Sequence, residues 1–360
     1  MRRIGLLPLA VVALGSAVAA VVLAADRSTV RSTADLPPFY GVGLSTPASA
    51  LDYERMARGG VRMARFVIDW RQVQPDAGSG YRWPQADRYM RGLARHGLEP
   101  LPLLFATPGW VARSYIRAPL ASPRAKKAWR GFVHAAVARF GPGGAFWAQN
   151  PDLSYDPVRY WQIWNEENSP DFWAPKPSPA AYARLLKITA GTLRAADPNA
   201  KIVLGGMFEG NVSYGAILSW RYLAQLYRLG AARYFDVVGA HPYSPRLSGY
   251  EFQIRRLAAA MRRHGHGGTP IWIDEIGWGS GRRGSPLSRG PRGQARMLRR
   301  AFRFAERSRD RLAVERILWY PWRDSGHTPE KCAFCGRTGL RRADGSAKPS
   351  WNEFRRFALH

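Results

Sequence analysis

The sequence predicts one α/β domain with the architecture of a (β/α)₈ TIM barrel, preceded by an N-terminal signal or anchor segment. From Phe39 onward, short apolar runs alternate with amphipathic segments, which is the pattern of repeated βα units. Roughly 330 residues follow the N-terminal segment, a length suited to one barrel with decorated loops. With 46% hydrophobic and 12% aromatic residues, the chain can bury a large core.

Eight apolar runs have the length and composition of strands. They lie at residues 40–44, 61–68, 99–105, 160–164, 201–205, 235–240, 270–274 and 316–319. The amphipathic segments that separate or follow them lie at 48–58, 84–96, 123–140, 179–196, 214–229, 250–264, 290–308 and 351–357. Several of these begin with proline, which is tolerated in the first turn of a helix because its missing N–H has no partner there.

A doubly wound sheet would show the same alternation of strands and helices. That fold usually binds phosphate at a glycine-rich turn after its first strand. Residues 41–45 read Gly-Val-Gly-Leu-Ser and lack the third glycine, so the barrel is the better prediction.

The first 26 residues predict export. Arg2 and Arg3 precede an uncharged stretch from Ile4 to Ala25. This stretch is consistent with a cleaved signal peptide or with a retained helix that attaches the protein to a membrane. Residues 27–38 are expected to form a linker and 39–360 the barrel domain. We expect the protein to be secreted or held in the cell envelope.

The chain is strongly basic, with 54 Lys and Arg against 26 Asp and Glu and a formal charge of +28. The arginines are scattered along the chain, whereas a nucleic-acid-binding protein more often concentrates them in one stripe or motif. We therefore expect no nucleic-acid partner. The charge is compatible with a solvated basic surface, or with attraction to lipid, wall polymers or an acidic polysaccharide.

The two cysteines, Cys332 and Cys335, are separated by two residues near the C-terminus. In an exported chain such a pair predicts a local disulfide. A zinc site would need further ligands, and only His327 is near in sequence. A thioredoxin-type site would place the pair at the start of a helix after an early strand.

Two glutamates follow predicted strands at the end of a barrel where catalytic residues sit. Glu166 follows the fourth strand and Glu275 the seventh. Two inward carboxylates at one rim can approach within the roughly 5–5.5 Å that retaining glycosidases require. The charge of one would then raise the pKa of the other and keep it protonated. The neighbours Glu167 and Asp274 are weaker candidates, because alternation would turn their side chains away.

Four motifs together resemble the clan A glycoside hydrolases, and most closely the bacterial family 39 and family 5 type. They are Asn165-Glu166 on the fourth strand, Glu275 on the seventh, His241-Pro242-Tyr243 on the sixth and Arg65 on the second. The resemblance runs from about Tyr40 to Phe357.

The resemblance implies Glu166 as the general acid/base and Glu275 as the nucleophile of a retaining O-glycoside hydrolase. Arg65 and Tyr243 would hydrogen-bond the Glu275 carboxylate and keep it ionised. It further implies that Asn165 holds the sugar 2-hydroxyl, while His241 contacts the sugar or supports Glu166.

Tryptophans are expected to supply stacking surfaces for sugar rings. The eighth strand offers Trp319 and Trp322, and the family pattern favours Trp322. About half of four further tryptophans are expected to line the cleft: Trp70, Trp110, Trp173 and Trp278. Asp69 is expected either to contact substrate or to cap the next segment. Substrate choice is expected to depend on the long loops at 107–122, 141–157 and 280–291.

The sequence has neither metal-ligand spacing nor a nucleophile elbow, so we expect no metal and no organic cofactor. The expected partner is a carbohydrate, bound by a monomer. Two alternatives stay open. A noncatalytic carbohydrate-binding barrel would have no need of the glutamate pair, and a transglycosylase would share every residue with a hydrolase.

Overall fold

The computed structural model describes residues 39–209, 212–281, 284–326, 332 and 334–360. The expected signal or anchor segment and the linker, residues 1–38, lie outside the described residues. Among the residues that are described, no helix has the length and apolar character needed to cross a membrane.

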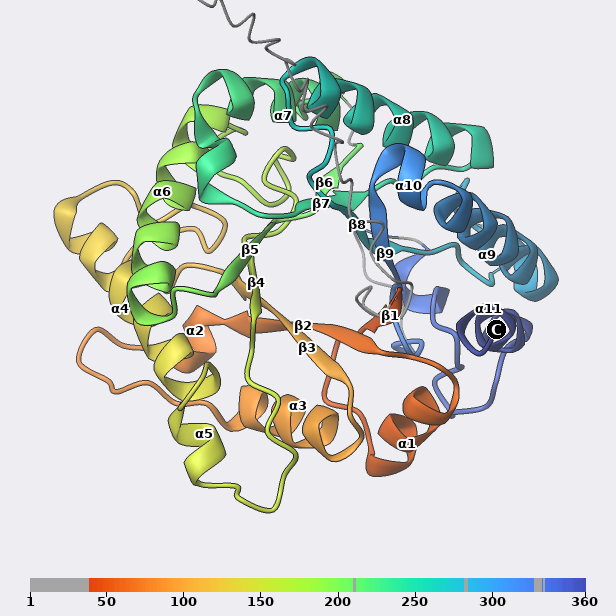
Figure 1. The fold of residues 1–360 in the computed structure, drawn as a ribbon, viewed down its shortest axis with the longest axis horizontal. Coiled ribbons are helices and arrows are strands. Elements are labelled where there is room, and N and C mark those ends of the chain that lie inside the picture. The colour runs from red at the N-terminus through yellow and green to blue at the C-terminus, as the bar shows by residue number, and fades with distance from the viewer. Residues whose placement is uncertain (1–38, 210–211, 282–283, 327–331, 333) are drawn as a thin grey trace, which may run out of the picture. The chain divides into compact units, whose positions relative to one another are not determined.

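The described chain forms a barrel of parallel strands surrounded by helices (Figure 1). Around the sheet the strands follow the order β5-β4-β3-β2-β1-β9-β8-β7-β6. A parallel bridge between Val203 of β5 and Val237, the residue before β7, closes the ring. The strands are β1 Tyr40–Gly43, β2 Met63–Asp69, β3 Glu99–Phe105, β4 Tyr160–Ile163, β5 Lys201–Leu204, β6 Met207–Phe208, β7 Val238–His241, β8 Ile271–Ile276 and β9 Val314–Trp319.

The predicted eightfold barrel is confirmed, because β6 continues the course of β5 after a short break and lies just beyond the predicted strand 201–205. Gly205 and Gly206 separate them. A Cβ atom on Gly206, whose φ is +79°, would lie 2.1 Å from His241 Nε2. Only glycine therefore lets this strand pass so close to the histidine ring.

Helices follow the strands around the outside of the barrel (Figure 1). The main ones are α1 Ala50–Arg58, α3 Pro84–Arg95, α4 Pro123–Phe140, α6 Pro179–Ala196, α7 Ser219–Arg228, α8 Leu247–Arg263, α9 Gly290–Arg307 and α11 Pro349–Ala358. The bounds of α4 and α6 are those predicted. Ser122 and Ser178 cap them by accepting a hydrogen bond from a backbone N–H, and proline occupies the first turn of each.

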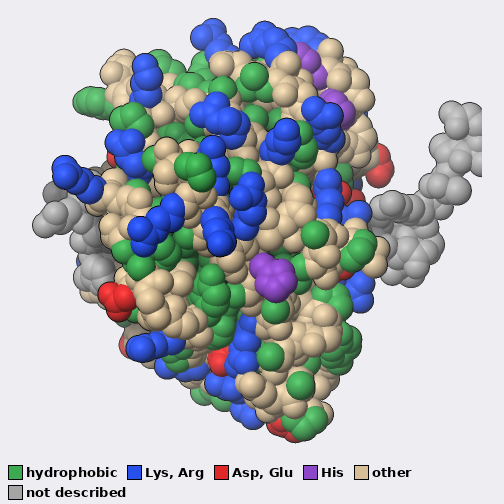
Figure 2. Space-filling view, turned by 90° about the vertical axis from the view of Figure 1, so that its left-hand side faces the viewer, with side chains coloured by type: hydrophobic (Ala, Val, Ile, Leu, Met, Phe, Trp, Pro, Cys, Tyr) green, Lys and Arg blue, Asp and Glu red, His purple; other side chains and the backbone are tan. Residues whose placement is uncertain are grey.

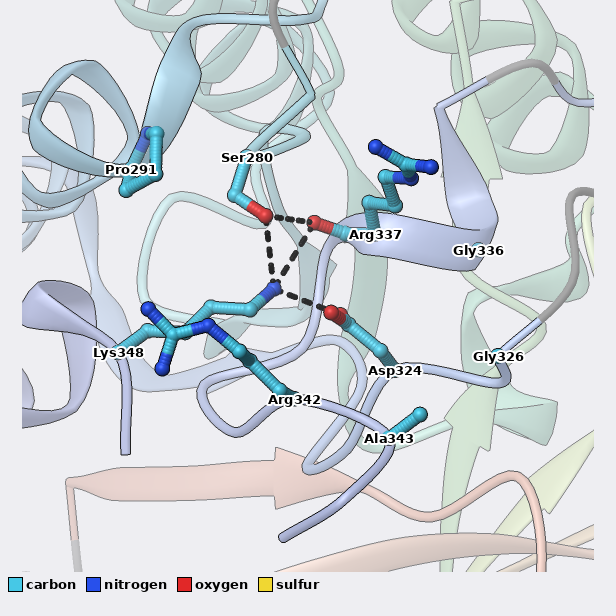
Figure 3. A pocket seen from close by; sticks show the side chains of 9 residues that line it. All are labelled: Ser280, Pro291, Asp324, Gly326, Gly336, Arg337, Arg342, Ala343 and Lys348. Carbon is cyan, nitrogen blue, oxygen red and sulfur yellow. Dashed lines mark hydrogen bonds and ion pairs between the residues drawn. The ribbon is translucent and has the colours of Figure 1, made fainter. Parts of the chain in front are cut away.

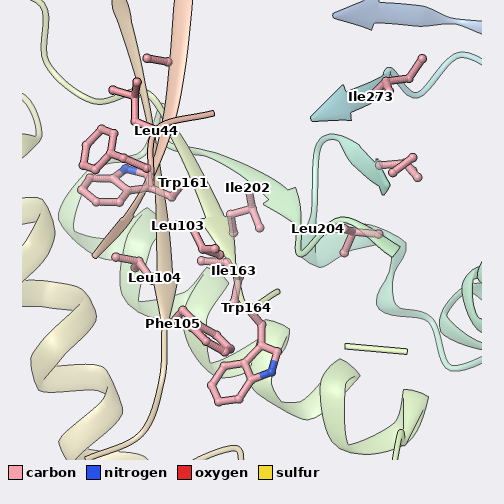
Figure 4. Close-up of a cluster of buried hydrophobic side chains, with 14 of the residues drawn as sticks. Leu44, Leu103, Leu104, Phe105, Trp161, Ile163, Trp164, Ile202, Leu204 and Ile273 are labelled. Carbon is pink, nitrogen blue, oxygen red and sulfur yellow. The ribbon is translucent and has the colours of Figure 1, made fainter. Parts of the chain in front are cut away.

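Strand alternation divides the core into two regions. Outward residues, such as Trp161 and Ile163 of β4, pack beneath the helices in a large apolar cluster (Figure 4). Inward residues fill the floor of the barrel, where Arg316 bonds Glu99 at 2.6 Å and lies 4.3 Å from the ring centre of Trp272. Because the floor is filled, a ligand can enter only from the opposite end, where the strands terminate.

Candidate active site

The fourth strand ends in an unusual backbone conformation that presents Asn165 and Glu166. Trp164 and Glu166 have φ values of 70° and 43°, in the left-handed region that L-residues rarely adopt. The conformation is held by Trp164 N donating to Leu104 O, and by Glu166 N donating to Gly205 O at 3.0 Å. Backbone strain of this kind is concentrated at functional sites.

A β-bulge in β8 brings two consecutive acids into the barrel. Ile273 pairs with Ile317 and Ile276 with Trp319, so β8 contains one more residue than β9 over this stretch. The extra residue breaks the alternation. Asp274 and Glu275 consequently both lie on the interior side, and the prediction that Asp274 turns away from the site is wrong. The other part of that prediction is right, because Asp274 is a fully buried hydrogen-bond partner.

Glu166 and Glu275 face each other at the open end of the barrel. One carboxylate oxygen from each and one ring nitrogen of His241 all lie within 4.8 Å of one another. Arg65 Nη1 donates to Glu275 Oε2 at 2.9 Å and Tyr243 Oη to Glu275 Oε1 at 2.8 Å. The structure thus contains both hydrogen bonds expected for the Glu275 carboxylate.

Below this pair lies a layer of buried polar side chains. His241 Nδ1 is 2.8 Å from Glu166 Oε1, and His241 Nε2 is 3.4 Å from Asp274 Oδ2. Gln162 donates to Asp274 and accepts from Arg65 Nε. Since His241 is fully buried, it supports Glu166 from beneath and is not placed to contact a sugar.

The charges within this layer balance when Glu166 is protonated. Burial raises the pKa of Glu166 most, the charge of Glu275 adds to the rise, and His241 opposes it. Burial lowers the pKa of His241, but Glu275 and Asp274 raise it more, to about 10. The proximity effect expected from sequence is therefore present, but burial is the larger cause. Two cations, Arg65 and His241, then face the anions Asp274 and Glu275.

Glu166, His241 and Glu275 are also close enough to be considered as metal ligands. Both nitrogens of His241 face carboxylate oxygens, however, and a ring protonated at both positions has no lone pair for a metal. These donors fit a proton-transfer site better than a metal site. The absence of a cofactor stays a prediction.

A cavity of about 520 Å³ opens above the two glutamates. Asn165, Glu166 and Glu275 line it, together with Arg65 and Tyr243. Apart from Tyr243 and Phe334, six aromatic residues form its walls: Phe66, Phe105, Tyr115, Phe172, Phe208 and Tyr320. Cys332 and Cys335, which form the predicted disulfide, also line it beside Phe334. The volume is within the usual range for a small-molecule site.

Neither tryptophan predicted from the eighth strand lines this cavity. Trp319 is fully buried and donates to Thr338 O, while Trp322 is 3% exposed and packs edge-on against Trp351. Inward positions on β9 are even-numbered, starting from Arg316 and Leu318. Tyr320 continues that series into the cavity, and alternation applied from Leu318 could have identified it.

The other tryptophan and loop predictions are right only in part. Trp70, Trp110, Trp173 and Trp278 do not line this cavity, and all but Trp110 are buried in the core. Loop 141–157 connects α4 to β4, so it lies at the closed end of the barrel. Loop 107–122 does contribute Tyr115. Asp69 caps the short helix α2 Trp70–Val73 by accepting from Arg71 N.

Glu167 is buried on the other side of β4. Both its carboxylate oxygens lack a hydrogen-bond partner among the described residues. One of them packs against Gly205, where a Cβ atom would come within 2.3 Å. Burial raises the pKa of Glu167 to about 8, with smaller contributions from Asp274 and Glu166. As predicted, its side chain points away from the cavity.

Glu167→Gln is expected to flatten the pH dependence of stability. A carboxyl whose pKa rises from about 4.5 unfolded to about 8 folded binds more protons in the native state, so its contribution to stability falls as pH rises through that window. Between pH 5 and pH 8 the wild type should lose about 2–4 kcal/mol more unfolding free energy than the variant. Urea titrations at the two pH values measure this difference. Equal losses in both proteins would contradict it.

A second cavity, of about 330 Å³, lies beside the C-terminal segment (Figure 3). Its buried ammonium, Lys348, donates to Ser280 Oγ, to Asp324 Oδ1 and to the backbone oxygen of Arg337, at 2.9, 2.7 and 3.1 Å. All three of its hydrogens are thereby used. Lys348 ties together three segments of the chain, and this cavity has no pair of facing carboxylates like that of the barrel.

The fold and the glutamate pair define a class, the (β/α)₈ barrels with an acid pair at the ends of two strands. No protein-family model matches the sequence, and no curated protein matches it. Many solved structures match the fold.

Three of the matching structures, each of them a glycosidase, illustrate the likeness. A family 39 glycoside hydrolase from Bacteroides cellulosilyticus WH2 is 19% identical with a TM-score of 0.64, over 90% of this chain and 64% of its own. A monomeric beta-xylosidase from Caulobacter crescentus CB15 is 20% identical with a TM-score of 0.64, over 88% and 67%. An exo-beta-1,4-mannosidase from Opitutaceae bacterium strain TAV5 is 16% identical with a TM-score of 0.62, over 91% and 60%.

The chain thus spans 60–67% of the length of these proteins. The family 39 and family 5 resemblance stated from sequence is supported by shared architecture. At these identities the likeness establishes the barrel fold and leaves the activity to be argued from the site.

Proposed function

We propose that the protein is a retaining glycosidase that hydrolyses O-glycosidic bonds by double displacement. The observation that carries this proposal is the approach of Glu166 and Glu275 to within 4.8 Å. Inverting enzymes keep their carboxyl groups about 6.5–9.5 Å apart to admit a water molecule between sugar and base. The shorter distance between Glu166 and Glu275 excludes such a water molecule and allows one carboxylate to attack the anomeric carbon directly.

In this mechanism, Glu275 attacks the anomeric carbon while Glu166 gives its proton to the leaving oxygen. A glycosyl ester on Glu275 results. Glu166, now ionised, removes a proton from water, which displaces Glu275 and restores both groups. Arg65 and Tyr243 hold the Glu275 carboxylate in place, and His241 holds Glu166. Asn165 accepts from Arg65 through its Oδ1, which leaves its amide nitrogen to bind a sugar hydroxyl.

The predicted export remains part of this proposal, with a substrate outside the cytoplasmic membrane. The uncharged stretch from Ile4 to Ala25 supports it. N-terminal sequencing of the native protein distinguishes a cleaved segment from a retained one, because a retained segment begins at or near Met1.

The test is the anomeric configuration of the first product. Aryl β-xylosides and β-mannosides are the first substrates to try, since structurally similar proteins are described as acting on those sugars. Proton NMR during hydrolysis should show the substrate's configuration before mutarotation, and Glu275→Gln should release no product. An inverted product would contradict the mechanism. Glycan binding without turnover across a broad panel would indicate a binding barrel instead.

A further inference from the structure

Three neighbouring outer helices carry no acidic residue. Helices α4, α6 and α7 together contain ten basic side chains and no Asp or Glu. Every other described helix of nine or more residues has at least one acid. The three helices pack side by side in order. We call this surface the basic face.

The basic face is exposed and largely without internal charge compensation. Among the described residues, only Arg139 and Arg194 of its ten cations have a carboxylate partner, in Asp87 and Asp236. Lys and Arg side chains gather over the side of the barrel that contains α4 and α6, where few acidic side chains are visible (Figure 2). The exposed cations without an ion pair are Arg124, Lys127, Arg130, Arg184, Lys187, Arg221 and Arg228.

The basic face adjoins the catalytic cavity. The segments that lead into its three helices contribute Tyr115, Phe172 and Phe208 to one wall of the cavity. In a βα barrel the helices start at the end where the strands finish, so the face begins at the rim of that wall. A polymer that leaves the cavity over this wall meets the face directly.

The cavity itself does not favour an anion. Its described lining contains the acids Glu166, Asp171 and Glu275, and its only basic side chain, Arg65, is engaged by Glu275 and Asn165. An uncharged sugar therefore suits the cleavage point. Negative charges on the same polymer would be attracted to the exposed cations outside the cavity.

We propose that the basic face binds an anionic polysaccharide, whose carboxylate or phosphate groups hold the chain while an uncharged sugar unit occupies the cavity. The assignment of this polymer as the substrate rests on the proposed glycosidase function. The 18-residue helices α4 and α6 extend about 27 Å, so the face is long enough to hold several sugar units.

Charge reversal on the face tests the proposal. The face variant combines Lys127→Glu, Arg130→Glu, Arg184→Glu and Lys187→Glu. The matched control makes the same change in net charge on α9, on the opposite side of the barrel (Figure 1), with Arg292→Glu, Arg296→Glu, Arg300→Glu and Arg303→Glu. Both sets are placed in a Glu166→Gln background, so that binding is measured without hydrolysis.

Polygalacturonate is the anionic probe and dextran the neutral one. Polygalacturonate should bind the Glu166→Gln parent more tightly than dextran does. The face variant should weaken this binding about tenfold or more, and the α9 control less than about threefold. Raising NaCl from 0.15 M should weaken binding in the parent, because screening shortens the range of these charges below about 8 Å.

Three results would overturn the proposal. The first is that polygalacturonate and dextran bind with equal affinity. The second is that the face variant and the α9 control lose equal affinity for polygalacturonate, which would indicate an effect of the charge of the whole molecule. The third is that the face substitutions weaken binding to phosphatidylglycerol vesicles but not to polygalacturonate, which would assign the surface to a membrane.

Turnover of a neutral aryl glycoside, measured with Glu166 intact, separates this proposal from the proposed function. The face substitutions should leave that turnover unchanged. If no aryl glycoside is hydrolysed while polymer binding still depends on the face, the glycosidase proposal fails and the binding surface stands. If hydrolysis occurs but the face substitutions do not change polymer binding, only the binding proposal fails.

Discussion

Glu275→Gly is expected to lower kcat/KM on an aryl glycoside by about 10⁴-fold or more, because the attacking carboxylate is removed. The substitution also leaves space beside Arg65 and Tyr243, the two donors to the missing carboxylate. Azide can enter that space and attack the anomeric carbon from the same side. The product should be a glycosyl azide of inverted configuration, identified by NMR.

Glu166→Ala is the matched comparison for that result. On an aryl glycoside with a good leaving group, Glu166→Ala should slow the first step less than Glu275→Gly does, because such a group can leave without being protonated. Azide should here attack the glycosyl ester on Glu275, so the azide product should retain the substrate's configuration. If the two variants gave the opposite stereochemical outcomes, the roles of Glu166 and Glu275 would have to be exchanged.

The pH profile provides a second check on Glu166. Its raised pKa keeps the acid protonated to higher pH than an ordinary glutamate. Wild-type activity should therefore fall as pH rises through that raised pKa, because the leaving oxygen loses its proton donor. Glu166→Ala should lose this alkaline limb on a substrate with an activated leaving group.

Arg65→Met is expected to destabilise the fold and to impair catalysis together. The guanidinium bonds Gln162, Glu275 and Asn165 and lies 3.6 Å from Asp274. Its loss leaves buried negative charge without compensation, which costs about 3–5 kcal/mol of unfolding free energy. Since Glu275 also loses one of its two positioning donors, kcat should fall about 100-fold.

Arg316→Met is the control for Arg65→Met. Arg316 is equally buried in the barrel interior and pairs with Glu99, but it lies at the floor, away from the cavity. Its loss should also lower stability, measured by urea denaturation, and leave kcat near the wild-type value. If both variants lost activity in proportion to stability, the effect of Arg65 on catalysis would be purely structural.

Strand and helix positions were readable from local patterns. The bounds of α4 and α6 were correct because serine, proline and the apolar period all mark the same residues. Helix α7 starts five residues later than predicted, since Val212–Tyr214 form a separate 3₁₀ turn. Such a turn has the same apolar content as a helix start, and only its packing distinguishes the two.

Site residues that end a strand were predictable from the sequence. Those whose access to the cavity depends on neighbouring strands were less so. Arg65, Tyr243 and Glu275 lie in contact as expected. The aromatic walls were misjudged: the cavity takes Tyr320 where Trp319 and Trp322 were expected. Residue type favours tryptophan for sugar stacking, but whether a ring reaches the cavity depends on alternation and on what covers it.

The sequence by itself determined the repeated βα pattern, the excess of basic residues and the two glutamates that follow strands, because these are properties of residue order and composition. Only the tertiary structure decided that a bulge in β8 turns both Asp274 and Glu275 inward. It also decided that the buried Glu167 carboxylate has no hydrogen-bond partner within the described part of the chain, and that three helices free of acids lie together. Bulges, burial and neighbouring surfaces arise from pairing between segments distant in the chain, and no local pattern contains that information.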